Sequence, residues 1–437
     1  MAATVPPGPR LPGVVIAALL LRDPVGFLER TRDRYGPIFR VRFPGYPRYV
    51  YVATPELARE VYAADRTVGR AGDARRDFLE PVVGEHSLLC TEGEEWLEHR
   101  KLLGPAFHRR VVDGYREEIA AIARAEIARW PVGTPFALRP SMQAITLEVI
   151  LRLVFGLSEG PRLDRLRALL AEMIAAAGSP LAWLVPSSAW DALGRRPRLR
   201  STVGRPIGRF LRARAGANAL LFEVIAERRA AGARGGGDAL SIMVEDGSLT
   251  DQAIRDELLT LLQAGHETTA TALAWAFERL THTPDVLARL SHEVRGEDGY
   301  DGELLKAVVR ETLRARPVVL DSPRRLSGPL ELGGYTIPAG WMVAPAIPLV
   351  QSSGGERFAP GAGDDGWIPF GGGKRHCVGS HLALVELEVV IAEVVRAVDL
   401  HAADASPERE RLRHVTLAPS REGTVIARPR VREPVPV

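Results

Sequence analysis

Ten residues near the carboxyl end of the chain combine a cysteine, basic side chains and three consecutive glycines. They read Phe370-Gly371-Gly372-Gly373-Lys374-Arg375-His376-Cys377-Val378-Gly379. Consecutive glycines permit backbone conformations closed to other residues and let a bulky group approach closely. We predict that Cys377 stands at the start of a buried helix over about 378–398, where backbone N–H groups and the helix dipole stabilise a thiolate.

Three uses of this cysteine can be compared. A lone cysteine is usually an inert core residue, which is our interpretation of Cys90. A zinc site is a poor alternative for Cys377, because no second cysteine lies at ligand spacing. A third use is as axial ligand of a haem iron, where a thiolate donates electron density and favours O–O cleavage. Arg375, two residues earlier, can then reach a haem propionate.

A second polar group interrupts a long apolar segment that we predict as a helix over about 250–281. Its centre reads Ala264-Gly265-His266-Glu267-Thr268-Thr269. Glycine costs about 1 kcal/mol relative to alanine inside a helix, and a threonine hydroxyl can bend a helix by bonding to the carbonyl four residues back. Glycine, acid and hydroxyl together predict a polar notch. The alternative is a polar pair on a solvated helix face.

The elements that must position these groups are mostly helical. Apolar residues recur at steps of three and four along most of the chain, which predicts amphipathic helices. The segments with this spacing are 94–103, 141–155, 163–176, 207–230, 250–281, 301–315 and 378–398. β-rich runs over 38–43 and 49–53 predict a hairpin, and runs over 330–337 and 341–344 predict a second small strand region. The fold class expected is mainly α with a small β region.

Composition sets outer bounds on function. The 437 residues are 46% hydrophobic and 25% charged, with a net charge of +3, which fits a folded protein and gives no reason to expect nucleic-acid binding. Two cysteines cannot form a disulfide framework, so we expect a reducing cytosol. The apolar run at 14–21 is too short for a membrane span, which needs about 20 residues. A cytoplasmic protein with no membrane span is expected.

The cysteine segment matches the haem-binding signature of the cytochrome P450 family, Phe-x-x-Gly-x-Arg-x-Cys-x-Gly, at every fixed position. The resemblance extends from the proline-rich start to about Pro429. It implies a single domain over 1–437 with the cytochrome P450 fold and one haem b. The haem-binding loop is then 370–379, with Phe370, Arg375 and Gly379 around the haem and Cys377 as the axial ligand of the iron.

The resemblance also implies roles for other residues. Thr268 and Glu267 match the family's oxygen-activation motif, with Glu where many members have Asp, and would handle dioxygen and protons. Ala264 would lie beside the haem and substrate. Trp96 and Arg100 match Trp-x-x-x-Arg and would donate hydrogen bonds to a propionate. At the third propionate contact, the spacing to Gly333-Gly334 favours Arg324 over Arg325.

A further motif is structural by resemblance. Glu311 and Arg314 lie at i, i+3 and would be buried with Arg357 beneath the haem. On an exposed surface the same pair would contribute little. Between 345 and 370 the chain is shorter than is usual in the family, which leaves the stability of the loop before Cys377 open to question.

The reaction implied is insertion of one oxygen atom of O₂ into a small, mostly apolar organic substrate. No flavin or iron–sulfur module is fused to the chain, so electrons from NAD(P)H would arrive through a separate ferredoxin reductase and ferredoxin. A basic patch of Lys101, Arg109, Arg110 and Lys374 is expected to dock the ferredoxin. By resemblance the substrate pocket is lined by 71–87, 179–195, Ala264, 318–322 and 417–420.

Two alternatives stay open. One is a haem-thiolate peroxygenase or isomerase that needs no external electrons, although such members tend to lose the Glu267–Thr268 pair. The other is a non-catalytic haem-binding protein, for which the shortened 345–370 segment is the only support.

Overall fold

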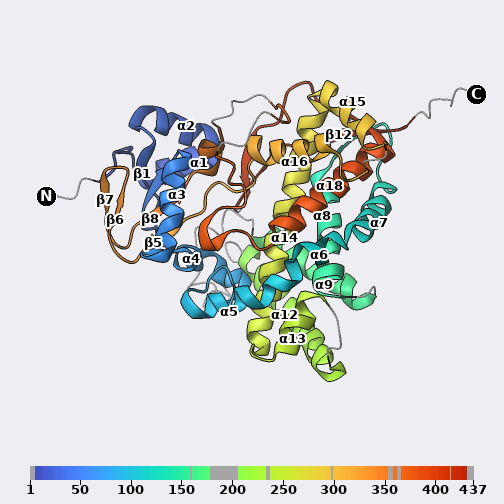
Figure 1. The fold of residues 1–437 in the computed structure, drawn as a ribbon, viewed down its shortest axis with the longest axis horizontal. Helices are drawn as coiled ribbons and strands as arrows, with labels where there is room; N and C mark the ends of the chain where they lie inside the picture. The colour runs from blue at the N-terminus through green and yellow to red at the C-terminus, as the bar shows by residue number, and fades with distance from the viewer. Residues whose placement is uncertain are drawn as a thin grey trace, which may run out of the picture. The chain divides into compact units, whose positions relative to one another are not determined.

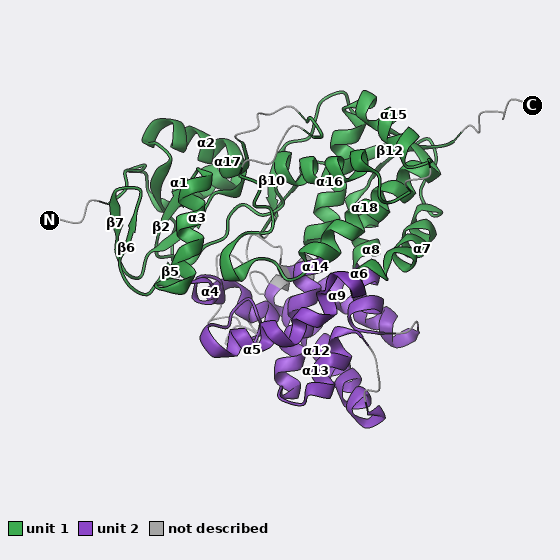
Figure 2. Cartoon of the chain, in the orientation of Figure 1, with its two compact units in different colours: residues 1–69, 112–146, 266–437 green, residues 70–111, 147–265 purple. Residues whose placement is uncertain are grey.

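The computed structural model describes residues 5–157, 160–177, 205–232, 237–296, 299–352, 358–361, 366–413 and 415–430. The chain forms two compact units, each assembled from segments far apart in sequence (Figure 2). Unit 1 comprises Met1–Gly69, Val112–Thr146 and His266–Val437, and unit 2 comprises Arg70–Val111 and Leu147–Gly265. One domain over 1–437 stays a prediction.

A five-stranded sheet with the order β1-β2-β8-β5-β3 organises one end of unit 1 (Figure 1). Its strands are β1 (Ile38–Arg42), β2 (Arg48–Val52), β3 (Gly69–Arg70), β5 (Arg324–Leu326) and β8 (Met342–Pro345). β1 and β2 form the predicted antiparallel hairpin, and β2 runs parallel to β8. The parallel pair joins segments almost 300 residues apart, so strands near the amino terminus are fixed against the segment that leads to the cysteine loop.

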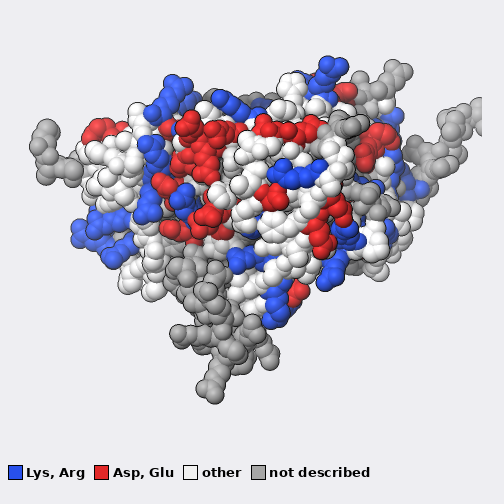
Figure 3. Space-filling model, turned by 90° about the horizontal axis from the view of Figure 1, so that it is seen from below, with Lys and Arg blue, Asp and Glu red and all other residues white. Residues whose placement is uncertain are grey.

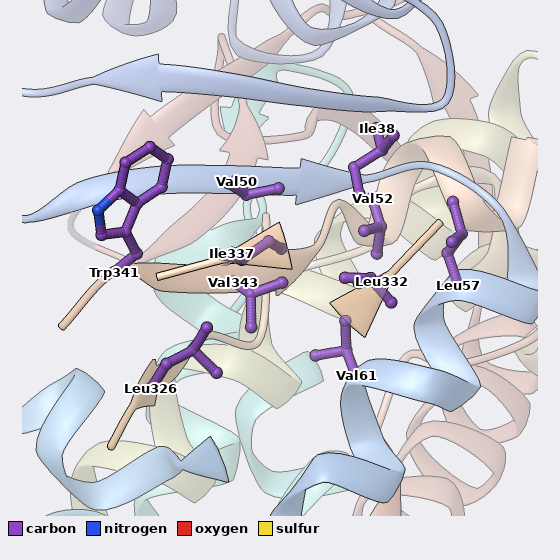
Figure 4. Close-up of a cluster of buried hydrophobic side chains, with 10 residues drawn as sticks. All are labelled: Ile38, Val50, Val52, Leu57, Val61, Leu326, Leu332, Ile337, Trp341 and Val343. Atoms are coloured by element: carbon purple, nitrogen blue, oxygen red, sulfur yellow. The ribbon is translucent and has the colours of Figure 1, made fainter. Parts of the chain in front are cut away.

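The core of this sheet is aliphatic. Alternate side chains of β2 and β8 point to one face, because the side-chain period of a strand is two. On that face Val50, Val52 and Val343 pack with Leu57 and Val61 of α3 (Pro55–Ala63), as Figure 4 shows. Helix α3 is started by the Thr54 side chain, which accepts a hydrogen bond from Leu57 N, and by a proline at its first position.

Unit 1 contains several helices, among them a long carboxyl-terminal one. They are α1 (Gly13–Arg22), α2 (Pro24–Tyr35), α3, α7 (Arg116–Ile127), α15 (Pro284–Glu293), α16 (Glu303–Ala315), α17 (Ile347–Gln351) and α18 (Ser380–Ala397). Helix α18 packs against α7 and α16. Most of its side chains are buried, as the apolar pattern of 378–398 predicted. Small sheets complete the unit. One has three strands, β4 (Pro135–Ala137), β12 (Thr424–Pro429) and β9 (Val398–Ala402), in that order. The other two are hairpin-like pairs, β6 (Leu330–Leu332) with β7 (Tyr335–Ile337) and β10 (Glu410–Arg413) with β11 (Thr416–Pro419).

Unit 2 is helical. It contains α4 (Ala71–Val83), α5 (Gly93–Leu103), α9 (Pro161–Ala177), α12 (Arg205–Ala231) and α13 (Ala239–Asp246), and α9 packs along α12. The strand β3 and three helices cross the unit boundary, and the helices are α6 (Arg109–Asp113), α8 (Arg139–Val149) and α14 (Asp251–Thr281). Within the described residues, no helix has a stretch long and apolar enough to cross a membrane.

Two expectations differ from the structure in detail. The helix expected over 141–155 begins at Arg139 as α8 and turns into a π-helix over Ile150–Val154. A side chain at Gly265 would come within 2.7 Å of Ile150 Cδ1, so this glycine allows the π-turn to approach α14. The run over 330–337 is two strands, β6 and β7, because Gly333 and Gly334 adopt φ of 55° and 79° and reverse the chain between them.

Candidate active site

The cysteine loop is closed by backbone hydrogen bonds of its own. Cys377 N donates to Phe370 O at 3.1 Å, and Gly371 N donates to Ile368 O at 2.9 Å. Gly371 and Gly373 have positive φ of 69° and 66°, a conformation that other residues rarely adopt. Cys377 itself is exposed, three residues before α18 begins at Ser380. The predicted position of this thiol at the start of a largely buried helix is confirmed.

A buried arginine anchors the glycines of the loop. Arg324 is 1% exposed and forms a two-point ion pair with Asp65. A Cβ on Gly372 would lie 2.4 Å from the Tyr62 ring, so glycine is required for this close approach. The remaining N–H groups of Arg324 bond the carbonyls of Ser322, Pro323 and Gly372.

This anchoring bears on the assignment of Arg324. All five of its N–H groups already meet acceptors of the chain, so a propionate contact would have to share or replace one of them. Its place as a propionate contact stays a prediction, as does the alternative Arg325, which is half-buried in the same strand. Asp65 could not be recognised as a partner from sequence spacing, because 259 residues separate the two.

A second buried network supports the approach to the loop. Glu311 and Arg314 are 4% and 6% exposed and form a bidentate ion pair at 2.7 and 2.9 Å. Gln351 was not singled out in the sequence, yet it joins this pair to the loop. Its side-chain amide donates to Leu313 O, and its Oε1 accepts from Ile368 N at 2.9 Å. Arg357 lies outside the described residues.

The polar notch of α14 is held by α8. Arg139 donates to Glu267 Oε1, and Gln143 Nε2 donates to Glu267 Oε2 at 2.7 Å. Glu267 is 2% exposed, so both carboxylate oxygens are fixed away from solvent. Burial acts to lower the pKa of Arg139, but the Glu267 and Glu422 carboxylates outweigh it and raise that pKa. Arg139 therefore stays charged, and sequence spacing gave no signal for it.

One face of α14 is open in the middle of the helix. Ala264 is exposed and Thr268 is half-buried, whereas the residues before 263 and after 268 are mostly buried. The two positions are four apart and so share a face. His266 points elsewhere and bonds Thr146, and burial lowers its pKa to about 4. The open face therefore carries a small side chain and a hydroxyl.

A buried acid lies next to the notch. Glu386 of α18 is 1% exposed, and its Oε1 has no hydrogen-bond partner among the described residues. Burial raises the pKa of this carboxyl well above its usual value, and a hydrogen bond with Thr269 only partly opposes the shift. Glu386 thus contacts α14 at Thr269, the residue next to Thr268.

In unit 2, α5 carries the expected Trp96 and Arg100 one turn apart. Trp96 is 6% exposed and Arg100 is half-buried. Between them His99 is 3% exposed and bonds Glu257 of α14 at 2.7 Å, which ties α5 to α14. Burial acts to lower the pKa of His99, but Glu257 outweighs it and raises that pKa.

Cys90 is fully buried, and burial raises the pKa of its thiol to about 12, as expected of an inert cysteine.

These features fit a haem. Among the described residues, no group of three or more His, Cys, Asp or Glu side chains could hold a metal ion. The thiol is exposed at a helix start, glycines clear the space around its loop, and a mid-helix face is open at Ala264 and Thr268. Cys377 would hold the iron, and Arg375, Trp96 and Arg100 are donors suited to propionates.

Comparisons with known proteins show the family of the chain. The family model for cytochrome P450 matches residues 6–425. Cytochrome P450 135B1 of Mycobacterium tuberculosis is 40% identical over 97% of this chain and 91% of its own. Cytochrome P450 138 of the same organism is 36% identical over 98% of this chain and 99% of its own.

Solved structures share the fold. The haem domain of cytochrome P450DA superposes with a TM-score of 0.79 at 23% identity, covering 99% of both chains. The cyanobacterial CYP120A1 with bound retinoic acid gives a TM-score of 0.80 at 21% identity, covering 98% of this chain and 100% of its own. The predicted fold class is therefore confirmed. This chain belongs to the cytochrome P450 family, whose members are monooxygenases with haem b as cofactor.

Proposed function

We propose that this chain inserts one oxygen atom of O₂ into a small, mostly apolar organic substrate in the cytoplasm, with electrons from a separate ferredoxin and ferredoxin reductase. The observation that carries the proposal is Cys377, an exposed thiol at the start of α18 in a loop closed by its own backbone. Two buried networks hold that loop in place. A chain that retained only the fold would not need this thiol to be accessible.

Cys377 is proposed as the thiolate ligand of the iron. The haem, when bound, supplies the redox chemistry that activates O₂. Arg375 of the loop and Trp96 and Arg100 of α5 are proposed to bind the propionates, while Phe370 and Gly379 shape the loop around the ring. The Glu311–Arg314–Gln351 network keeps the loop from collapsing, because it fixes the backbone N–H of Ile368.

Thr268 and Glu267 are proposed to manage protons. Thr268 has a hydroxyl on the open face of α14, where it can donate a hydrogen bond to dioxygen. Glu267 is held by Arg139 and Gln143 at both oxygens, so it is positioned to pass protons toward Thr268 once either contact loosens.

The substrate is proposed to be apolar. Ala264, Val318 and Leu417 belong to segments assigned to the pocket by family resemblance, and each carries an aliphatic side chain. The assigned segment 179–195 lies outside the described residues. The cyanobacterial CYP120A1, which has the same fold, binds retinoic acid. Apolar pockets orient ligands with few polar groups. A panel of terpenoid, fatty-acid and aromatic compounds, read by the low-to-high-spin shift of the haem, would identify the class.

Turnover separates this proposal from its rivals. The holoprotein is mixed with a surrogate ferredoxin, its reductase and NAD(P)H, and in parallel with hydrogen peroxide alone. We expect product that requires NAD(P)H and O₂. Product from peroxide, with none from NAD(P)H, O₂ and the ferredoxin system, would favour a peroxygenase, and rearranged product without either oxidant would favour an isomerase. A low-to-high-spin shift of the haem on substrate addition, with no product under any condition, would indicate a non-catalytic haem-binding protein.

A further inference from the structure

Two tyrosines of β2 share one carboxylate oxygen. Tyr49 and Tyr51 are two positions apart, so both point to the face of the sheet opposite the valines that Figure 4 shows on this strand. Their hydroxyls both donate to Asp321 Oδ2 at 2.8 Å. Burial, reinforced by this carboxylate, raises the pKa of Tyr51 well above its usual value, so the hydroxyl stays a donor. We name the three residues the tyrosine clamp.

The tyrosine clamp is sheltered from solvent. Over the face in Figure 3, acidic and basic side chains are interspersed, and water competes for contacts of that kind. Asp321 is half-buried, whereas Tyr49 and Tyr51 are 8% and 2% exposed. Hydrogen bonds to a charged acceptor are roughly twice as strong as neutral ones. A single donor would let the carboxylate pivot, but two donors from one strand also fix its direction.

The carboxylate belongs to an extended stretch of chain, the 318–322 segment, which joins α16 to β5. Backbone hydrogen bonds hold this segment on two sides. Leu417 N of β11 donates to Val318 O at 2.7 Å, and Ile347 N of α17 donates to Leu320 O at 3.0 Å. The tyrosine clamp adds a side-chain contact with β2, so the segment is fixed from three directions.

One end of the 318–322 segment reaches α14. Trp275 of that helix is fully buried, and its Nε1 donates to Leu417 O at 2.7 Å. Trp275 follows Thr268 by seven residues, which is close to two helical turns, so the two side chains leave the same side of α14. The hydrogen bonds from Trp275 to Leu417 and on to Val318 therefore tie the segment to the side of α14 that carries Thr268.

The other end of the segment reaches the cysteine loop. Ser322 Oγ and the Tyr62 hydroxyl share a hydrogen bond of 2.9 Å. The Tyr62 ring lies so close to Gly372 that a Cβ on this glycine would have no room. The 318–322 segment therefore runs from the Thr268 side of α14 to the cysteine loop.

We propose that Tyr49 and Tyr51 are positioning residues for substrate. Through Asp321 they fix the 318–322 segment against a substrate that lies between the cysteine loop and that side of α14. Val319 is half-buried, whereas both of its neighbours are buried, so it offers the open apolar surface of the segment. The inference rests on the proposed function only for the place of the substrate.

A brace that serves the sheet alone would use the same hydrogen bonds. Losing the two hydroxyls would then lower the thermal stability and the haem content, but the protein would keep its preference among ligands. A positioning role predicts the reverse, because a loosened segment changes the contact with a ligand that extends to it and leaves a small ligand unaffected. The two roles are therefore separated by a pair of ligands that differ only in reach.

Imidazole and 4-phenylimidazole are such a pair. Both can bind haem iron through a ring nitrogen, and only the second adds an apolar ring that extends beyond the iron. The haem-loaded protein is titrated with each, and the Soret shift gives Kd. Tyr49→Phe with Tyr51→Phe should raise Kd for 4-phenylimidazole on the order of tenfold, which corresponds to about 1.4 kcal/mol, and leave Kd for imidazole within about twofold.

The single variants keep the test open if the double variant loads no haem. Tyr49→Phe leaves the Tyr51 hydroxyl on Asp321 and should raise Kd for 4-phenylimidazole about threefold, again without a change for imidazole. Val319→Ala shortens the apolar surface directly and should show the same selective loss.

Tyr35→Phe with Tyr335→Phe is the matched control, since it removes two hydroxyls from half-buried tyrosines elsewhere in unit 1. Both Kd values should stay within about twofold of the parent. Equal rises for the two ligands in the clamp variants, or no rise for 4-phenylimidazole, would overturn the inference. The titrations need bound haem but no turnover, so a failure of the proposed oxygenase reaction would appear in the turnover assay and not in them.

Discussion

At the scale of single residues, Thr268 is the most direct test of the oxygen chemistry. Thr268→Ala should keep haem and substrate binding but divert electrons to hydrogen peroxide, because dioxygen loses its hydrogen-bond donor. Product formed per NAD(P)H consumed should fall severalfold. Thr281→Ala, at the end of the same helix where its hydroxyl bonds Phe277 O, is the control and should leave coupling intact. An unchanged ratio of product to NAD(P)H consumed in Thr268→Ala would show that Thr268 has only a structural role.

Glu386 makes a prediction about pH. Burial raises the pKa of its carboxyl in the folded protein, so the folded state holds a proton that the unfolded state releases above about pH 4.5. The free energy of unfolding should therefore fall as pH rises through that value toward the raised pKa. Glu386→Gln should flatten this slope and be at least as stable at pH 8, measured by thermal unfolding of the holoprotein.

The control for Glu386 lies on the same helix. Glu393 pairs with Arg124 and Arg396, so Glu393→Gln removes ion pairs and should destabilise the protein instead. A Glu386→Gln protein that unfolds at a lower temperature than the parent at pH 8 would mean that Glu386 is ionised in the fold.

Residues of the candidate site and of its supporting networks could be predicted from the sequence only where they belong to a local motif. Cys377, Glu311 and Arg314 were found because their partners or context lie within ten residues. Arg139 and Asp65 were missed, since their contacts with Glu267 and Arg324 span 128 and 259 residues. Sequence spacing carries no information at such separations, whereas the folded chain brings the side chains within hydrogen-bond distance.

At the scale of elements, α16 carries both a buried ion pair and an exposed one, so the stability costs of losing each can be compared. Glu311→Ala leaves Arg314 buried without its partner, which costs on the order of 3–5 kcal/mol, and should give apoprotein or aggregate. Gln351→Ala frees the Ile368 N–H and should cost about 1–3 kcal/mol, with partial loss of haem. Glu303→Ala on the same helix breaks only an exposed pair with Lys306 and should cost less than about 0.5 kcal/mol.

Thermal unfolding and the haem-to-protein absorbance ratio measure all three variants. A haem-loaded Glu311→Ala protein as stable as Glu303→Ala would contradict the account of the network.

The helices themselves were well predicted, because their apolar spacing is local. The π-turn at Ile150–Val154 was not predicted, and it packs against α14 at Gly265, more than 100 residues along the chain.

At the scale of the whole molecule, the separate electron donor leads to a prediction about salt. Arg109 and Arg110 are exposed in α6. If an acidic ferredoxin docks through them, its reduction of the haem should slow as ionic strength rises, because salt screens the attraction. Arg109→Glu with Arg110→Glu should slow it further at low salt, measured by stopped flow, and leave peroxide-driven turnover unchanged.

Arg165→Glu with Arg212→Glu is the control, since both arginines are exposed on other helices of unit 2. It makes the same change in net charge and should reduce the rate far less. Equal losses in the two double variants would show a response to net charge alone, and the docking surface would have to lie elsewhere.

The central claim is that Cys377 ligates the haem iron as a thiolate. The reduced carbon monoxide complex tests it most directly, because a thiolate ligand gives that complex a red-shifted Soret band. We expect the band in the parent protein and in Cys90→Ser, whose thiol is buried and held neutral. We expect no such band in Cys377→His with haem bound. A red-shifted band that survives in Cys377→His would contradict the account.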